Sequence, residues 1–503
     1  MGKSTKSNVN SVFVISAVIA ALVAVWGIIA NDSFSAIANW LMQGLQENFS
    51  WLYLGAMLFF VLFSVILAFS RFGKIRLGDD DAKPEYSTVS WFAMLFAAGM
   101  GIGLVYWGVA EPLSHYIAPM KGIEPATEEA ARFSIRSCFM HWGLHPWSCY
   151  AVMGLGLAYF QFRKKEPTLV SSLLKPVLGD KKSVEWIKTG IDIFTVVLTV
   201  IGVATSFGMG CLQISSGLNY LFGVPNNRYT WLLLIVIISC VFLRSAMSGV
   251  SKGIKILSNT NLVLFVILMI AAFLIGPGNS ILKIMLQGVA DYIINFFPDS
   301  IRMSSEGDSS WIQGWRVFYW AWWLSWAPFV GVFVARISKG RTIREFVLGA
   351  ILVPTAVSVV WFSVFGGLAL NVADQFTLEQ LAQITSESQT TLFCIFNQYP
   401  MGIILSLIAM ILLIIFFITS ADSATFVLAM LTSEGDLNPS NNKKVFWGIL
   451  MSMLAFALII SGGISVIQTI AIVIAFPFLF ILLLICLNLL MLNSKKFACL
   501  RSL

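Results

Sequence analysis

Residues 315–326 read Trp-Arg-Val-Phe-Tyr-Trp-Ala-Trp-Trp-Leu-Ser-Trp and open an apolar stretch that extends from Arg316 to Arg336. Within this stretch, Trp322, Trp323 and Trp326 lie six to ten residues beyond Arg316. A helix rises about 1.5 Å per residue, so these tryptophans are expected roughly 9 to 15 Å inside a hydrocarbon core about 30 Å thick.

That depth calls for a role other than anchoring. Tryptophans that anchor membrane helices belong at the headgroup level, a position that suits Trp315 and Trp320. Indole is the strongest cation–π face among the side chains. The three deeper tryptophans therefore indicate a site for a cation that no nearby carboxylate neutralises.

The composition predicts an all-α polytopic membrane protein. The 503 residues are 58% hydrophobic and 11% charged, whereas about a quarter of the residues of a soluble domain are charged. A spanning helix needs about 20 apolar residues. Twelve stretches meet this length, near residues 11–31, 51–70, 89–110, 137–159, 190–216, 230–248, 256–278, 316–336, 345–370, 401–430, 444–462 and 466–492.

The basic residues predict the orientation. With both termini in the cytoplasm, 25 of the 32 Lys and Arg residues fall in cytoplasmic segments, as the positive-inside rule requires. The net charge of +7 is then a matter of topology and gives no reason to expect nucleic-acid binding. We expect a multi-pass protein of the bacterial cytoplasmic (inner) membrane. The seven cysteines include no C-x-x-C pair and suggest neither disulfides nor a thiolate metal site.

The long connections divide the chain into five parts. Residues 279–315 form an external loop, within which apolar residues from Ile281 to Phe296 recur at three- and four-residue steps, as in an interfacial amphipathic helix. Counted from residue 89, five helices precede this loop and five follow it, so the two sets have opposite orientation, as in inverted-repeat transporters. The parts are residues 1–88 (tail and two peripheral helices), 89–278 (first repeat), 279–315 (loop), 316–492 (second repeat) and 493–503 (short cytoplasmic tail).

A glycine run interrupts the first helix of the first repeat. Residues 97–103 read Ala-Ala-Gly-Met-Gly-Ile-Gly, and glycines two residues apart do not share a helix face. Each glycine costs about 1 kcal/mol relative to alanine in a helix, so the run predicts local unwinding. Unwound backbone inside a membrane lines a cavity, where its N–H groups can bind a carboxylate and its carbonyls a sodium ion. Close helix packing is the alternative.

The next helix brings further aromatic residues. Trp147 and Tyr150 are three residues apart and project together, and a bend at Pro146 would turn Trp142 toward the same cavity. Ordinary core packing is the alternative for each ring. His141 and His145 have the i, i+4 spacing of zinc ligands, but no third ligand is evident, and intramembrane histidines or a proton relay fit better.

Two carboxylates lie away from the centre. Glu111 is expected at the external end of its helix as a structural or gating carboxylate, and Asp192 near a cytoplasmic mouth beside Lys188. Neither is expected to neutralise a central cation.

Hydroxyl groups gather in the tenth predicted span. Thr419 and Ser420 stand inside the apolar run 416–425, where they either bond back to the helix or, with carbonyls of residues 97–103, form an all-oxygen site for a hard monovalent cation. Thr199, Thr205 and Ser206 of the fifth span offer similar groups.

These motifs together resemble the betaine/choline/carnitine transporter family. The likeness rests on the glycine run with Glu111-Pro112, on residues 141–147, and on residues 318–323 through 336–342. It implies a leucine-transporter-type core of five plus five helices after two extra N-terminal helices. It also implies a homotrimer that contacts through the external amphipathic helix.

The resemblance also implies roles for individual residues. The trimethylammonium group would sit in an aromatic box, with two tryptophans lining the path on either side and the glycine-rich run completing the site. In this run the chain resembles the sodium-coupled glycine betaine members, whereas choline importers tend to carry a carboxylate there. The box residues are Trp142, Trp147, Tyr150 and Trp323, the path residues are Trp322 and Trp326, and the run contributes Gly99, Met100, Gly101 and Gly103.

Two sodium sites are implied in the same way. One would lie between the carbonyls of Ala97, Met100 and Phe416 and the hydroxyls of Thr419 and Ser420. The second would use Thr199 and Ser206 near Phe329. Here the chain departs from the family pattern, because Val203 stands where a threonine is expected, which puts the second site in doubt.

We therefore expect a secondary active transporter that imports a quaternary ammonium compatible solute, most simply glycine betaine, by sodium symport with alternating access, and that serves osmoprotection. Sodium is the coupling ion, and no other cofactor is expected. A sodium-independent or proton-coupled carnitine or choline transporter or exchanger is the alternative, and an osmosensory channel or receptor is the alternative of another class. A membrane enzyme is not expected, since no nucleophile–base pair is evident.

Overall fold

The computed structural model describes residues 10–99, 101–179, 182–248, 251–303 and 309–491. Within these residues the regular structure is helical, apart from an isolated antiparallel bridge between Arg76 and Thr342. Ten helices of the described chain are long and apolar enough to cross a membrane. They are α1 (Ser11–Ile29), α2 (Asn31–Phe69), α9 (Glu185–Phe222), α10 (Arg228–Ser248), α11 (Ser251–Ile275), α15 (Phe318–Arg336), α16 (Ile343–Ala373), α19 (Gly402–Leu431), α20 (Asn441–Ile460) and α21 (Ile464–Met491).

An eleventh span is broken at the glycine run. Helices α3 (Thr88–Gly99) and α4 (Ile102–Ile117) meet at a bend of 62°. Gly101, between them, is fully extended, with φ −169° and ψ −179°. The helix is thus interrupted where the sequence predicts unwinding. Met100 lies outside the described residues.

The span predicted at 137–159 is also divided. It falls on α5 (Glu128–Trp142) and α6 (Leu144–Ala158), which are separated by Gly143. The break therefore lies at Gly143, and Pro146 occupies the first turn of α6, so the prediction that Pro146 bends a continuous helix is wrong. Proline is accepted in a first turn because the N–H groups there have no helical partner. The described residues hold ten helices long and apolar enough to span a membrane, or eleven spans with the broken pair α3–α4, and the count of twelve stays a prediction.

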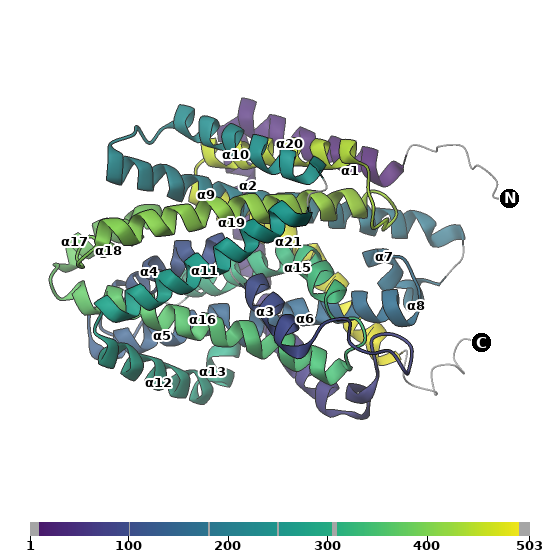
Figure 1. Cartoon of the computed structure of the whole chain (residues 1–503), viewed down its shortest axis with the longest axis horizontal. Helices are drawn as coiled ribbons and strands as arrows, with labels where there is room; N and C mark the ends of the chain where they lie inside the picture. The colour runs from purple at the N-terminus through teal and green to yellow at the C-terminus, as the bar shows by residue number, and fades with distance from the viewer. Residues whose placement is uncertain (1–9, 100, 180–181, 249–250, 304–308, 492–503) are drawn as a thin grey trace.

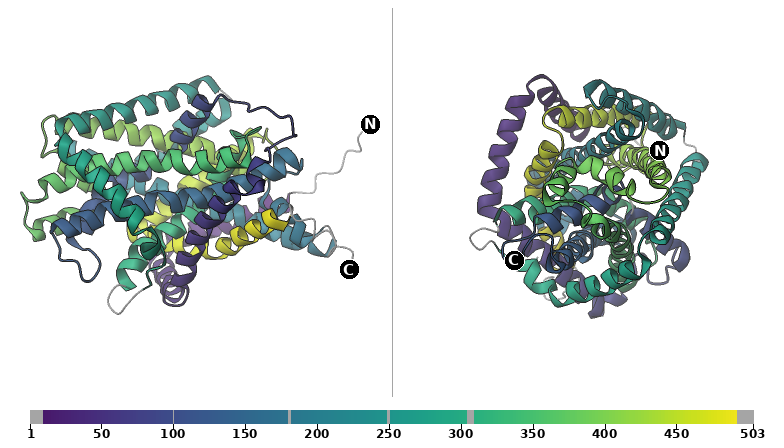
Figure 2. Two further views of the ribbon diagram at one scale, coloured as in Figure 1. Left: turned by 90° about the horizontal axis from the view of Figure 1, so that it is seen from below. Right: turned by 90° about the vertical axis from the view of Figure 1, so that its left-hand side faces the viewer.

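The arrangement separates central from peripheral helices. Helices α9 and α15 are largely buried, whereas less than a third of the apolar stretch of α1, α10 or α11 is buried, as expected of lipid-facing helices. Most of the long helices run side by side, and the start of α1 and the end of α21 lie at the same end of the molecule (Figure 1). Viewed along these helices, an outer set surrounds an inner group (Figure 2).

Close packing joins the helices that carry the tryptophans. Helices α6 and α15 pack along each other, and a Cβ on Gly154 would lie 3.3 Å from the carbonyl oxygen of Gly331. Small residues allow membrane helices to approach this closely. The backbones of α6 and α15 are therefore held next to each other, which places the aromatic residues of both helices in one region.

The predicted external helix is present as α12 (Gly278–Ile294), followed by α13 (Phe296–Ile301). Helix α12 packs against α5 and α16, burying Ile281 and Tyr292 and exposing Leu286 and Ile293. The remaining elements are η1 (Arg71–Lys74), η2 (Tyr159–Arg163), α7 (Val170–Leu173), α8 (Lys175–Leu178), η3 (Lys182–Val184), α14 (Ser309–Trp311), η4 (Ile312–Val317), α17 (Leu378–Ser386) and α18 (Ser388–Phe396).

Candidate functional site

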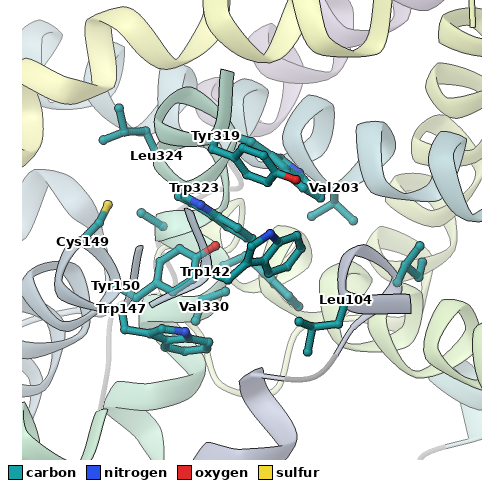
Figure 3. Close-up of a cluster of buried hydrophobic side chains, with 14 of the residues drawn as sticks. Leu104, Trp142, Trp147, Cys149, Tyr150, Val203, Tyr319, Trp323, Leu324 and Val330 are labelled. Atoms are coloured by element: carbon teal, nitrogen blue, oxygen red, sulfur yellow. The ribbon is translucent and has the colours of Figure 1, made fainter. Parts of the chain in front are cut away.

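A small cavity of about 60 Å³ lies between α4, α6 and α15. We call it the aromatic cavity, because six aromatic rings line it. Figure 3 shows four of these rings, those of Trp142, Trp147, Tyr150 and Trp323, gathered in one region with Leu104 and Val330 beside them. The aromatic lining is Trp142, Trp147, Tyr150, Trp322, Trp323 and Trp326, and the other lining residues are Gly101, Ile102, Gly103, Leu104, Pro146, Ser206, Val330, Ser358 and Ser420.

The rings around this cavity meet at steep angles. The ring centroids of Trp142 and Trp323 are 4.8 Å apart at 76°, and those of Trp147 and Tyr150 are 5.3 Å apart at 78°. The ring centroids of Tyr150 and Trp323 are 6.1 Å apart, and their planes meet at 87°. Edge-to-face packing of this kind is favourable by itself. The faces of these rings also point in different directions around the cavity, as in the aromatic cages that bind quaternary ammonium groups.

Hydrogen bonds hold three of the indoles that line the cavity in place. Trp323 donates its N–H to the carbonyl oxygen of His141 over 2.8 Å, and Trp326 donates to the carbonyl oxygen of Gly202 over 2.8 Å. The N–H of Trp322 reaches Ser206 Oγ at 3.3 Å. Since these N–H groups are satisfied by protein atoms, the indoles have no unpaired donor to direct at a ligand, and their electron-rich faces remain for it.

Gly103 allows two of the tryptophans to meet. A Cβ at this position would lie 2.8 Å from Cη2 of both Trp142 and Trp322, closer than real contacts permit. By contrast, a Cβ on Gly101 would meet nothing within 4 Å. The sequence assigned both glycines to helix unwinding, but only the extended Gly101 lies in the break. Gly103 lies inside α4 and serves the packing of the rings.

The described residues that line the aromatic cavity include no acidic or basic side chain. Their polar groups are the hydroxyls of Ser206, Ser358 and Ser420 and the hydroxyl of Tyr150, which has no hydrogen-bond partner among the described residues. The backbone from Gly101 to Gly103, at the N-terminus of α4, also faces the cavity.

A second, larger cavity of about 830 Å³ adjoins the first. We call it the vestibule. Gly101, Trp326, Val330 and Ser420 line both cavities. The vestibule reaches the loop between α19 and α20, and Asn10, at the start of α1, donates a hydrogen bond to Thr432 in that loop. The aromatic cavity therefore adjoins a wide space that leads to the end of the molecule where α1 begins.

The structure brings together most of the first predicted sodium site. Ala97, Phe416, Thr419 and Ser420 all line the vestibule next to the aromatic cavity, while Met100 lies outside the described residues. Thr419 Oγ1 donates to the carbonyl oxygen of Ile415 over 2.9 Å. A hydroxyl that donates in this way keeps its lone pairs for a cation, so the back-bonded conformation and a role as ligand are compatible.

The residues predicted for the second sodium site do not gather around one space. Thr199 is fully buried, lines neither cavity, and donates to the carbonyl oxygen of Thr195 over 2.7 Å. Ser206 lines the aromatic cavity, whereas Phe329 lines the vestibule. Thr205 donates to Gly202 within its own helix.

Glu111 differs from its sequence prediction. It lies within α4 rather than at its end and is completely buried. One carboxylate oxygen contacts His141 Nδ1 at 2.7 Å and His115 Nε2 at 3.3 Å. The other accepts the N–H of Trp142 at 2.8 Å and the hydroxyl of Tyr319. Glu111 is thus bonded directly to one ring of the aromatic cavity, although it does not line the cavity itself.

Trp320 is also placed differently from the prediction. It is fully buried and stacks on His145 with a distance of 4.9 Å between the ring centroids, so it is not an interfacial anchor. Trp315 is half-buried, and its ring centroid lies 4.4 Å from that of His115 and 5.5 Å from that of Trp107.

The two histidines considered as zinc ligands have separate partners. His141 bonds Glu111, whereas His145 Nε2 lies 2.9 Å from Ser300 Oγ. The donor atoms of Glu111, His115 and Cys138 do lie within 4.8 Å of one another. The spacing of Glu111 and His115, four residues apart on one helix, is the signal by which the sequence could have linked them.

Comparison with known proteins gives the family. A model of the betaine/carnitine/choline family of transporters matches residues 11–497. The glycine betaine transporter OpuD of Bacillus subtilis is 46% identical over 97% of this chain and 95% of its own length. An ectoine/hydroxyectoine transporter of Virgibacillus pantothenticus is 40% identical over 96% of both chains. The glycine betaine transporter of Acinetobacter baylyi is 41% identical over 95% of this chain and 73% of its own length. The chain is therefore a multi-pass membrane transporter that belongs to the betaine/carnitine/choline transporter family.

Proposed function

We propose that this transporter imports glycine betaine together with sodium by alternating access. The observation that carries the proposal is an aromatic cavity without a charged side chain among its described lining residues, next to a vestibule lined by the oxygen-bearing residues Thr419 and Ser420. The transporters of Bacillus subtilis and Acinetobacter baylyi that this chain resembles bear glycine betaine in their names.

The absence of a lining carboxylate favours a zwitterion over a cation. Burying an unpaired ion costs several kcal/mol, while a cation–π contact returns about 2 kcal/mol when desolvated. Choline would bring a positive charge for which the described lining offers no counter-ion. Glycine betaine brings its own carboxylate, so the pair enters with no net charge.

The N-terminus of α4 is the proposed partner of that carboxylate. The first N–H groups of a helix lack intrahelical acceptors and favour negative charge. The backbone of Gly101 to Gly103 supplies such groups in the wall of the same aromatic cavity. A betaine would then lie with its methylated ammonium among the rings and its carboxylate toward α4.

Sodium is proposed at the site formed by Ala97, Phe416, Thr419 and Ser420, with Met100 as a further carbonyl. One sodium contributes about 2.3 kcal/mol per 100 mV, which supports roughly a 50-fold gradient of a neutral solute. The scattered positions of Thr199, Ser206 and Phe329 give no support for a second ion. We therefore propose a single coupling ion.

The two sides of the cavity differ. Toward the loop between α19 and α20 it adjoins the vestibule, while toward η4 the rings of Trp107, Trp315 and Tyr319 pack against one another. We assign this open side and this packed side to an inward-facing state of the transporter. Both termini would then lie on the cytoplasmic side of a bacterial inner membrane. We also assign the exposed apolar face of α12 to contacts in a homotrimer.

Competition for uptake tests the substrate assignment. The protein in vesicles should take up labelled betaine, and unlabelled betaine should compete far better than choline. Ectoine is the second candidate, because a relative with 40% identity is named for it. Equal competition by choline would overturn the zwitterion argument, and stronger competition by ectoine would replace betaine as the substrate.

A further inference from the structure

Glu111 lies directly behind the aromatic cavity and ties three helices together. From α4 it accepts hydrogen bonds from Trp142 of α5 and Tyr319 of α15, and it contacts His141 of α5. The carbonyl of the same His141 accepts the N–H of Trp323. Two box tryptophans on different helices are thus oriented by one carboxylate and the histidine bonded to it.

The hydrogen bonding indicates that this carboxylate carries a negative charge. Glu111 accepts from Trp142 and Tyr319, and an ionised carboxylate is an acceptor at both oxygens. His141 Nε2 and His115 Nδ1 have no partner among the described residues. An unpaired lone pair is tolerated better in the interior than an unpaired N–H. Both imidazoles are therefore best assigned as neutral, each donating its one proton to Glu111.

The nearby arginine does not neutralise Glu111 by contact. Arg316 is fully buried, donates to the backbone carbonyl of Asp299, lies 3.6 Å from the carboxylate of the same residue, and stands over the ring of Trp311. Asp299 is also paired with Arg136 at 2.8 Å. The charge of Glu111 is consequently spread through several hydrogen bonds, and the one from Trp142 leads to the box.

We infer that Glu111 is a positioning residue that also strengthens the attraction of the Trp142 face for the substrate ammonium, through the hydrogen bond between its carboxylate and the indole N–H. An indole that donates to an anion is polarised by it, and its ring face becomes more attractive to a cation. The carboxylate supplies this attraction without lining the cavity. It therefore need not be desolvated again when substrate binds. The inference rests on the proposed betaine site.

The test compares betaine with its uncharged-head isostere, 3,3-dimethylbutanoate, in which carbon replaces the ammonium nitrogen. Binding of both to the purified full-length protein is measured by competition in wild type and in Glu111→Gln. Glutamine preserves shape and hydrogen bonding, because its oxygen accepts from Trp142 and Tyr319 while its amide donates to His141 after a tautomer change. A unit charge that acts on the substrate ammonium across about the width of one indole changes the binding affinity roughly tenfold.

We expect E111Q to weaken betaine about tenfold and to leave the anionic isostere unchanged or tighter. Equal weakening of both ligands would reduce Glu111 to a structural role and overturn the inference, as would no change in either. If E111Q does not fold, Glu111→Asp serves instead. It retains the charge and should preserve the wild-type ratio of the two affinities, and a lowered ratio would contradict the inference.

Glu345→Gln is the matched control. Glu345 is exposed and forms a capping box with Thr342 at the start of α16, a role that glutamine also fills. It should leave the affinity ratio unchanged, and a shift equal to that of E111Q would overturn the inference. A wild-type protein that fails to bind betaine at all would refute the proposed function itself, which separates the two failures.

Discussion

The indole N–H of Trp323 donates to the backbone carbonyl of His141 over 2.8 Å. This bond joins α15 to the last turn of α5. It fixes the indole at an angle of 76° to Trp142, the residue that follows His141. The two principal tryptophans of the cavity therefore form a unit whose geometry is set before any substrate enters.

The first prediction concerns Trp323. Trp323→Leu removes one face of the box and should raise the betaine concentration for half-maximal uptake by up to about 30-fold, the equivalent of about 2 kcal/mol. Trp186→Leu is the control, because Trp186 is 73% exposed at the beginning of α9. Transport kinetics in vesicles measure both. Similar values for the two variants would exclude Trp323 from the site.

Trp320 should behave differently from Trp323. It is fully buried and stacks on His145, but it does not line the cavity. Trp320→Leu leaves a void, and truncation of a buried tryptophan to alanine costs about 3 to 5 kcal/mol. We expect a lower melting temperature and a nearly unchanged betaine affinity in the folded fraction. Loss of affinity with unchanged thermal stability would contradict this placement.

A third prediction follows from the close contact at Gly103. Gly103→Ala forces the rings of Trp142 and Trp322 apart and should cost about 1 to 3 kcal/mol, as overpacking does. Betaine affinity should fall together with thermal stability. Gly55→Ala is the control, since a Cβ there meets nothing within 4 Å. If G103A and G55A have the same melting temperature and affinity, the rings are not held as described.

The sodium site allows a comparison within one helix. Thr419 and Thr425 both donate to carbonyls of α19, but only Thr419 lines the vestibule. Thr419→Val should raise the sodium concentration for half-maximal uptake roughly tenfold, because a polar contact to a charged group is worth about 1.5 to 3 kcal/mol. Thr425→Val should leave it unchanged. A larger effect at Thr425 would place the ion elsewhere.

Thr199 tests the number of ions. It is buried away from both cavities, and Val203 occupies the neighbouring turn of α9. Thr199→Val should therefore leave the sodium dependence of uptake unchanged, with a Hill coefficient for sodium near one. A Hill coefficient for sodium near two that falls in T199V would instead support a second sodium site.

The positions of the helices were predictable from the composition and the periodicity of the sequence. Long apolar runs must become helices in a membrane, since each backbone group needs an internal partner, so the helices lie where the runs do. The glycine run predicted a break, but not which of its glycines would be extended. The break at Gly143 was assigned to Pro146 instead, because a proline in a first turn and a proline at a kink look the same in sequence.

The sequence predicted the residues whose own rings line the cavity. It predicted less well the residues that affect the cavity through a hydrogen bond to another residue. Depth along the helix pointed to Trp322, Trp323 and Trp326, but depth does not say which face is buried, and Trp320 was therefore misplaced. The role of Glu111 depends on His141 and on Tyr319, from other helices. Such contacts arise from tertiary packing and leave no spacing pattern in the sequence.

The most direct measurement starts from vesicles that contain the same betaine concentration inside and outside, at zero membrane potential, with sodium raised only outside. The account predicts that betaine accumulates inside above its external concentration, and that Thr419→Val reduces this accumulation. Betaine that remains equal on both sides, or that moves only in exchange for internal betaine, would contradict sodium-driven import.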